Sequence, residues 1–190
     1  SSFAYVLSES DADPMTLLRT IVLPSRPANL NLEDFTHLDQ SMRAILPFLG
    51  HALATGRRGT NLLLYGPPGT GKSELSRLLA RETQAELFEV TSENEHGNAM
   101  DGERRLRAFR VAQCFLGQRR SLLLFDEVED VFPDSSPWGG ASASENKAWI
   151  NRMLEHNPVP TVWVTNAVHS LDPAFVRRYD LVVACPIPPR

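Results

Sequence analysis

The sequence is poor in the features that mark secreted, membrane-spanning and metal-rich proteins. It has only two cysteines in 190 residues, Cys114 and Cys185, and neither has a partner at metal-ligand spacing. Each lies among apolar residues, so we expect buried free thiols in a reducing compartment, the cytoplasm. No apolar run reaches the length of a membrane span. No series of charged, apolar and small residues marks a secretory signal.

An excess of positive charge is also missing. The formal net charge is −4, whereas a general nucleic-acid binder usually carries a basic surplus or stripe. One stretch does gather arginines: Arg104, Arg105, Arg107 and Arg110. A solvated helix face or a subunit contact is the plainer interpretation of this row. We therefore do not expect nucleic acid as a partner.

The apolar residues, in contrast, fall into two alternating patterns. A stripe at helical spacing from Phe35 to Leu53 predicts a helix with a kink or break at Pro47 and an end at Gly56. Short apolar runs then alternate with helical patterns, at residues 62–65, 87–90, 122–125, 161–164 and 181–184. This alternation predicts an α/β fold, a parallel sheet covered by helices on both faces.

The division of the chain follows from the same patterns. Residues 1–30 are irregular and predict a lead-in or linker, and residues 31–190 predict one compact core. Because the chain starts at Ser1 and ends on a proline-rich turn, we expect it to be a piece of a longer protein.

A phosphate-binding loop is the strongest motif. Residues 66–73 match Gly, four residues, Gly-Lys-Ser/Thr, after an apolar run and before a helical pattern. Glycines let backbone N–H groups turn toward phosphate oxygens, and the following helix presents its positive end. The predicted nucleotide-binding residues are Gly66, Pro67, Pro68, Gly69, Thr70, Gly71, Lys72, Ser73 and Glu74. Asn61, just before the first run, is a further candidate for the adenine pocket.

An acidic pair ends the most apolar run. Asp126 is expected to hold Mg²⁺ together with Ser73, and Glu127 to orient or deprotonate the attacking water. About fifty residues separate this pair from the phosphate loop, a spacing that strengthens both assignments. The next two acids, Glu129 and Asp130, are interpreted as solvated or helix-capping.

Two more polar features follow the fourth run. Asn166 is a candidate for holding the attacking water, and its plainer alternative is a turn residue. Arg177 and Arg178 follow a short helix that starts at Asp172-Pro173. Either arginine is a candidate for neutralising charge on a γ-phosphate, and the alternative is salt bridging at a helix C-terminus.

These motifs together resemble the AAA family of ATPases over residues 32–190, with Walker A at 66–73, Walker B at 122–127, sensor 1 at Asn166 and the second region of homology at 171–180. Bacterial soluble AAA proteins with an aspartate-proline-alanine helix and paired arginines are the most similar subgroup. The resemblance implies a three-layer αβα P-loop fold with a five-stranded parallel sheet in the order 5-1-4-3-2. It also implies Mg²⁺-dependent ATP hydrolysis in a ring, with an arginine finger acting on the neighbouring subunit.

The sequence departs from the family pattern in three places. Arg177 and Arg178 are adjacent, whereas the family arginines are three apart. Where substrate-threading members carry an aromatic pore loop, residues 98–103 read Asn-Ala-Met-Asp-Gly-Glu. In the family a helical lid follows the core, and we expect that lid to lie outside these 190 residues.

Several functions fit the motifs. ATP-driven remodelling of a protein client ranks first, and a nucleotide-dependent binding switch with slow hydrolysis is the alternative. A nucleic-acid-associated AAA member is supported only by the arginine row, and a small-molecule kinase ranks last. The stretch from Asp134 to Ser144, rich in small residues, is interpreted as a flexible loop.

Overall fold

The computed structural model describes residues 22–92, 99–131 and 141–188. Its strands are β1 (Val22–Pro24), β2 (Asn61–Tyr65), β3 (Glu86–Val90), β4 (Ser121–Phe125), β5 (Thr161–Thr165) and β6 (Leu181–Ala184). Its α-helices are α3 (Asp39–Thr55), α4 (Lys72–Glu82), α5 (Gly102–Leu116), α6 (Ala141–His156) and α7 (Pro173–Val176). Three short 3₁₀ helices are η1 (Leu32–Leu38), η2 (Val128–Asp130) and η3 (Val168–Ser170).

The strands form one sheet in the order β1-β3-β4-β5-β2-β6. From β3 to β6 along this order, every pairing is parallel, which confirms the parallel character predicted from the sequence. The predicted count of five was wrong, and the six-strand order therefore differs from the predicted order. The extra strand, β1, pairs antiparallel with β3 at the sheet edge. It escaped prediction because it has only three residues, ends on a proline and lies within the supposed lead-in.

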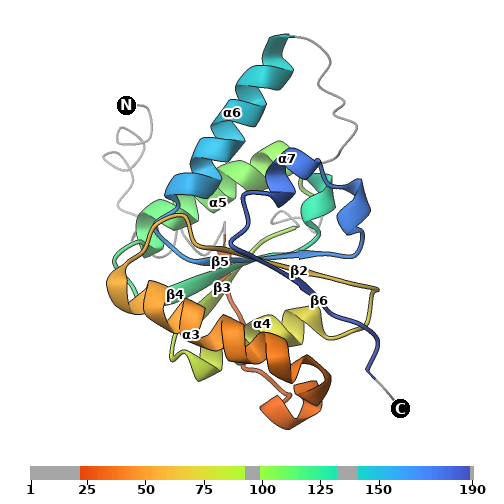
Figure 1. Cartoon of the computed structure of the whole chain (residues 1–190). Coiled ribbons are helices and arrows are strands. Elements are labelled where there is room, and N and C mark those ends of the chain that lie inside the picture. Colours follow the sequence, from red (N-terminus) through yellow and green to blue (C-terminus); the bar gives the residue numbers. More distant parts are fainter. Residues whose placement is uncertain (1–21, 93–98, 132–140, 189–190) are drawn as a thin grey trace.

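Helices cover both faces of the sheet, with α3 and α4 on one side and α5, α6 and α7 on the other (Figure 1). Successive strand residues point to opposite faces. Accordingly, Leu63 packs with the α5–α6 side, whereas Leu62 and Leu64 pack with the α3–α4 side. Burial on both faces explains why these strands are continuous apolar runs without polar alternation.

The predicted first helix is divided, but not where expected. Phe35 has non-helical dihedrals within η1, and α3 then runs unbroken through Pro47. The expected break at Pro47 was therefore wrong. The predicted end was right, because Gly56 adopts the left-handed conformation that closes α3.

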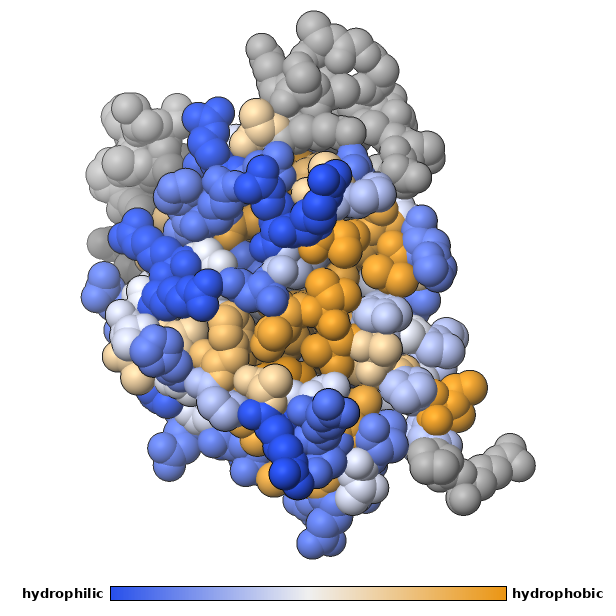
Figure 2. Space-filling model, viewed as in Figure 1, coloured by the Kyte–Doolittle hydropathy of each residue, from blue (hydrophilic) through white to orange (hydrophobic). Residues whose placement is uncertain are grey.

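The other edge of the sheet presents apolar side chains to solvent. Figure 2 shows hydrophobic residues gathered in the middle of the face on which Figure 1 places β6. Val182 in β6 is 43% exposed, and Ile187, which follows this strand, is 72% exposed.

Candidate functional site

The phosphate-loop sequence forms the turn between β2 and α4, as its pattern predicts. Gly66, Gly69 and Gly71 have φ values of 153°, 79° and 85°, which side chains rarely tolerate. A Cβ on Gly66 would lie 2.2 Å from the carbonyl oxygen of Cys185. Thr70 braces the turn by donating its hydroxyl to the carbonyl oxygen of Pro67 at 3.0 Å. The loop thus has a backbone shape that only this glycine pattern permits.

Lys72 begins α4 and turns its side chain back into the loop. Its ammonium donates to the carbonyl oxygens of Gly66 and Pro67, both at 2.8 Å, and to Oδ1 of Asn166 at 2.9 Å. Burial lowers the pKa of Lys72, and the nearby Cys185, Asp126 and Glu129 oppose that effect. The ammonium is therefore desolvated and held by neutral oxygens, a position in which an anionic ligand would be strongly favoured.

The acidic pair lies at the end of β4, next to the start of α4. Oδ2 of Asp126 accepts a hydrogen bond from the Ser73 hydroxyl at 2.8 Å. Oδ1 of Asp126 accepts from the backbone N–H of Glu127 at 2.9 Å. Glu127 is exposed and adopts the left-handed conformation, with φ 54° and ψ 53°. A side chain in that conformation is uncommon outside turns and functional sites.

Asn166 follows β5, and the sheet order explains its neighbours. Because β5 lies between β4 and β2, its end is flanked by the acidic pair and by the phosphate loop. Asn166 accepts from Lys72 and donates its backbone N–H to Oε1 of Glu129 at 3.3 Å. We call Lys72, Ser73, Asp126 and Asn166 the phosphate-edge cluster. These four predicted residues lie together, at the carboxyl ends of parallel strands, where α/β proteins bind ligands.

Arg105 belongs to the same region and was missed by the sequence analysis. It is 1% exposed, donates to the carbonyl oxygens of Asp126 and of Glu127 (3.3 Å), and stacks over the Phe125 ring at 4.5 Å. The interpretation of the arginine row as solvated was therefore wrong for this member. A signal was present, because Arg105 falls at helical spacing with the apolar Phe109 and Ala112.

Glu129 also differs from its prediction as a solvated or capping residue. Its side chain is half-buried, and Oε1 joins the end of β4 to the end of β5 through the Asn166 N–H. Among the described residues, its other carboxylate oxygen is buried without a hydrogen-bond partner.

Three predicted residues point elsewhere. Glu74 accepts from the Asn29 backbone and pairs with Arg26 and Arg77, and the Asn29 N–H is the main reason that its pKa is lowered. Arg178 is exposed and pairs with Glu155 on α6, and Arg177 donates to the carbonyl oxygen of Pro173 at 3.2 Å. The structure brings neither arginine to the phosphate-edge cluster of its own chain.

Two further expectations were wrong. Asn61 lies at the start of β2, the end of the strand opposite the phosphate loop, and its amide is buried against Leu154 and Trp163. It therefore does not shape a pocket beside the phosphate loop. Cys114 is exposed on α5, and only Cys185 is the buried thiol expected from the sequence.

Other expectations fall wholly or partly outside the described residues. The proposed loop from Asp134 to Ser144 overlaps residues 132–140, which are not described, and its last residues belong to α6. Of residues 98–103, where a pore loop was considered, Asn98 is not described. Asp101 caps α5, accepting from the backbone N–H of Arg104 at 2.8 Å.

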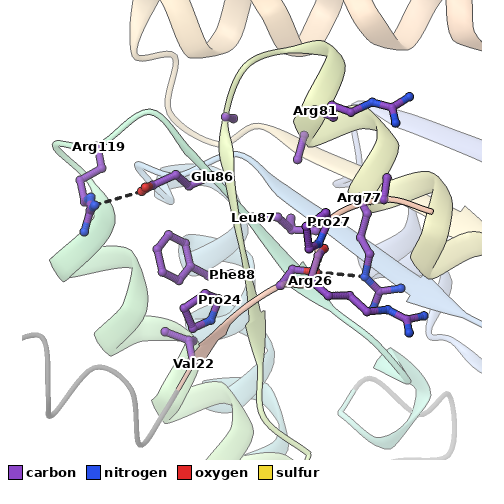
Figure 3. Close-up of a pocket in the computed structure, with 14 residues that line it drawn as sticks. Val22, Pro24, Arg26, Pro27, Arg77, Arg81, Glu86, Leu87, Phe88 and Arg119 are labelled. Atoms are coloured by element: carbon purple, nitrogen blue, oxygen red, sulfur yellow. Dashed lines mark hydrogen bonds and ion pairs between the residues drawn. The ribbon is translucent and has the colours of Figure 1, made fainter. Parts of the chain in front are cut away.

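A separate hollow of about 450 Å³ lies beside β1 and β3, lined by Pro24, Phe88, Arg81, Arg119 and neighbours (Figure 3). Its four arginines, at positions 26, 77, 81 and 119, pair with glutamates 74, 82, 86 and 89. Charge is therefore balanced locally, and none of the predicted site residues lines this hollow.

Within the described ranges 22–92, 99–131 and 141–188, no helix is long and apolar enough to cross a membrane. In the same ranges, no group of three or more His, Cys, Asp or Glu side chains is arranged to hold a metal ion.

The sequence of this chain matches a known protein family. Residues 62–187 match the family described as "ATPase family associated with various cellular activities (AAA)". The matched range contains the phosphate-edge cluster, Glu127 and both candidate arginines.

Relatives with curated names show the same relationship. ATPase family gene 2 protein homolog B of Bos taurus is 37% identical over 136 residues, which is 67% of this chain and 18% of that protein. A 26S proteasome regulatory subunit 8 homolog of Encephalitozoon cuniculi is 31% identical over 140 residues, 67% of this chain and 34% of that protein. Protein SUPPRESSOR OF K(+) TRANSPORT GROWTH DEFECT 1 of Arabidopsis thaliana is 28% identical over 184 residues, 90% of this chain and 42% of that protein.

The chain thus spans less than half the length of each of these relatives. None of these three relatives supports the expected kinship with bacterial soluble members.

Proposed function

The chain belongs to the AAA family of ATPases, and from this premise we propose that it binds ATP with Mg²⁺ and hydrolyses the γ-phosphate bond. The observation that carries the proposal is the buried Lys72 ammonium, which holds two loop carbonyls and Asn166 at the carboxyl edge of the sheet. An anion entering the loop would replace these neutral acceptors with charged ones. We propose residues 66–73 as the phosphate-binding element and residues 31–190 as the ATP-binding core, with β1 completing its sheet.

Ser73 and Asp126 fit a magnesium ion. Mg²⁺ prefers oxygen ligands and usually takes only one or two from protein, with the rest from phosphate and water. The Ser73 hydroxyl and the Asp126 carboxylate converge at 2.8 Å beside the loop, which is such a donor set. When bound there, Mg²⁺ would neutralise charge that develops on the phosphate oxygens.

The remaining residues divide the work of hydrolysis. Glu127 is exposed at the strand end, and we propose that its carboxylate orients and deprotonates the attacking water. We propose that Asn166, whose Oδ1 accepts from the Lys72 ammonium, holds that water against the terminal phosphate. Arg105 fixes the backbone that carries both acids, because its guanidinium holds the carbonyl oxygens of Asp126 and Glu127.

Arg177 and Arg178 support the assembly of a ring. Both are exposed, and their partners in this chain lie on α6 and α7, away from Lys72. Either one is therefore available to complete the site of a neighbouring copy, where an arginine is worth about 10³–10⁵-fold in rate in the best-studied NTPases. Val182 and Ile187 are apolar and exposed at the β6 edge, and they add surface of the kind that interfaces bury.

We propose a protein client in the cytoplasm as the target of this ATPase. Two points support this proposal: the relative named as a 26S proteasome regulatory subunit homolog, and the ring assembly proposed above. The missing aromatic residue in 98–103 favours the alternative, a nucleotide-dependent switch that hydrolyses ATP slowly and recruits a partner when ATP is bound. The negative net charge speaks against a nucleic-acid partner.

The test is ATP turnover per subunit against concentration of the full-length protein, with Arg177→Ala and Arg178→Ala as variants. A rate that rises steeply with concentration, and falls in one variant while ATP still binds, supports hydrolysis completed by a neighbour. Mixing the inactive arginine variant with Glu127→Gln should restore some turnover. The arginine variant keeps an intact Glu127, and the Glu127→Gln copy beside it supplies the missing arginine. Tight ATP binding with a flat, near-zero rate at every concentration would contradict the motor and support the switch.

A further inference from the structure

The turn after β4 carries a third carboxylate, Glu129, to which neither the motif nor the proposed mechanism gives a role. It lies in η2, two residues beyond Glu127, and its side chain is half-buried. Surface glutamates in short turns are usually solvated, so the partial burial of Glu129 calls for a physical reason.

One of its oxygens joins two strand ends. Oε1 of Glu129 accepts the backbone N–H of Asn166 at 3.3 Å, at the point where β5 has just ended. The side chain of Asn166 meanwhile reaches the Lys72 ammonium at 2.9 Å. Asn166 is exposed and lies beyond the regular ladder, so this backbone contact and the Lys72 contact together fix its position.

The second carboxylate oxygen of Glu129, Oε2, is in a less favourable environment. Oε2 is buried and has no hydrogen-bond partner among the described residues. A buried carboxylate oxygen without a partner is unfavourable unless a nearby charge compensates it. Lys72 supplies such a charge, because the negative charge of Glu129 raises the pKa of Lys72 against the lowering effect of burial. The carboxylate thus faces the cluster electrostatically as well as through Asn166.

We propose that Glu129 is a positioning residue, which holds Asn166 against Lys72 so that its amide reaches the reacting phosphate and water. Glu129 itself touches neither in this account. The inference rests on the proposed ATPase function and adds a residue to it. Because Asn166 acts on the hydrolytic step, loss of Glu129 should lower kcat and leave ATP affinity almost unchanged.

The experiment compares Glu129→Ala and Glu129→Gln in the full-length protein, with the exposed Glu33→Gln as a matched control. We expect Glu129→Ala to lower kcat about 10- to 100-fold, since small misplacements of catalytic groups have effects of this size. The KM for ATP should change less than about threefold. Glu129→Gln should recover part of the loss, because its amide oxygen still accepts the Asn166 N–H, and Glu33→Gln should match the wild type.

A double-mutant cycle with Asn166→Ala separates positioning from general damage. If Glu129 acts through Asn166, the kcat of the double variant should lie within about twofold of the kcat of Asn166→Ala alone. The proposal would be overturned if the kcat reductions of the two single variants multiplied in the double variant. An unchanged kcat in Glu129→Ala, with a wild type that turns over ATP, would also overturn it.

A second readout does not depend on turnover. Hydrogen exchange of the Asn166 amide should be faster in Glu129→Ala than in the wild type and close to the wild type in Glu129→Gln. Equal exchange in all three proteins would overturn the positioning role alone. Absence of turnover in the wild type, with the exchange pattern as expected, would instead overturn the proposed ATPase function.

Discussion

Both ends of the central sheet carry clusters of polar side chains, but the two clusters differ in burial, in charge and in partners. At the carboxyl end lies the phosphate-edge cluster, with its ammonium, its carboxylate and its hydroxyl. At the amino end lies a set of neutral groups, which we call the amide cluster: Asn61, Gln113, Asn157 and Thr161.

Every contact of the amide cluster is made within the fold. Gln113 donates to the carbonyl oxygen of Val159 at 3.0 Å and accepts the Val159 N–H at 2.7 Å. Asn61 donates to the carbonyl oxygen of Leu154 at 2.7 Å and accepts from the Trp163 indole at 3.0 Å. Neutral, mutually satisfied groups of this kind specify a unique packing of α5, α6 and β5.

The contacts of the phosphate-edge cluster can be exchanged for contacts to a ligand. Lys72 is as buried as many core residues, at 6% exposed, yet its partners are carbonyl and amide oxygens that bear no formal charge. An anionic ligand that replaced these neutral acceptors would give the ammonium charge-assisted hydrogen bonds. Burial alone therefore does not separate a structural polar group from a functional one, whereas a buried charge that is hydrogen-bonded only to neutral atoms does.

Two glycines, one at each end of the sheet, test whether only the carboxyl end contributes to ATP binding. Gly59 and Gly66 both have positive φ, and an added Cβ would meet carbonyl oxygens of Glu155 at 2.4 Å and Cys185 at 2.2 Å. We expect Gly59→Ala and Gly66→Ala each to lower the free energy of unfolding by about 2–5 kcal/mol. Only Gly66→Ala should also weaken ATP binding.

Chemical denaturation and nucleotide titration check this pair. Gly50→Ala is the matched control, since it lies in α3 with open space around it and should be neutral or stabilising. Equal loss of ATP affinity in Gly59→Ala and Gly66→Ala, measured on folded protein, would contradict the division between the two ends.

The second prediction concerns Lys72→Met. We expect ATP affinity to fall up to about 100-fold, because several charge-assisted hydrogen bonds to phosphate are lost. Calorimetric titration with ATP measures the affinity, and the exposed Arg43→Ala should bind ATP like the wild type.

Stability should respond differently to the same change. Burial lowers the pKa of Lys72 below its ordinary 10.5, so its charge opposes folding at neutral pH. That cost is present below the lowered pKa and disappears as the pH rises through it toward 10.5. In the absence of nucleotide, we therefore expect the Tm of Lys72→Met at pH 7 to lie within a few degrees of the wild type. A large drop in Tm would show that Lys72 is primarily structural.

The third prediction tests the amide cluster. Gln113→Ala should lower the free energy of unfolding by about 1–3 kcal/mol, because the buried Val159 N–H loses its acceptor. Its ATP affinity at a temperature where it is folded should equal that of the wild type. Gln40→Ala, at an exposed position of α3, provides the control for loss of a glutamine side chain. Weaker ATP binding in Gln113→Ala would tie the amide cluster to the site.

The smallest expected effect is on thiol reactivity. Burial raises the pKa of Cys185 to about 11, opposed by the nearby Lys72, so its thiol stays protonated at pH 8. Cys114 is exposed on α5. We expect iodoacetamide to add one label per native chain at pH 8, on Cys114, and two labels after denaturation. Labelling of both thiols at equal rates in the native protein would contradict the burial of Cys185 beside the loop.

The two ends also differ in how well the sequence predicts them. Residues 66–73, Asp126 and Asn166 follow buried apolar runs, and parallel strands bring such positions to one edge, so the phosphate-edge cluster was predictable. Arg105 and Glu129 were missed, because charged side chains are by default assigned to solvent. The helical spacing of Arg105 with Phe109 and Ala112 did signal its burial. The contact of Glu129 with Asn166 joins elements far apart in the chain and has no such signal. The amide cluster was missed because its contacts also join distant elements, and Asn61 was wrongly assigned to the adenine pocket.

The fold shows the same limit. Apolar runs between helical patterns predicted the five parallel strands, whereas β1 has only three residues and pairs at the edge that β3 offers. Pro47 was expected to break α3, but packing of Ile45 and Leu49 into the core holds the helix through it. Tertiary contacts decided both cases, and local sequence does not encode them.

The most direct test of the central claim is single-turnover hydrolysis of Mg²⁺-ATP by the wild type and by Glu127→Gln, with ATP affinity measured on the same samples. The account predicts that Glu127→Gln binds ATP as tightly as the wild type and leaves it unhydrolysed, because only the group that activates water has been removed. Hydrolysis at the wild-type rate by Glu127→Gln would contradict the assignment of the carboxyl edge of this sheet as the hydrolytic site.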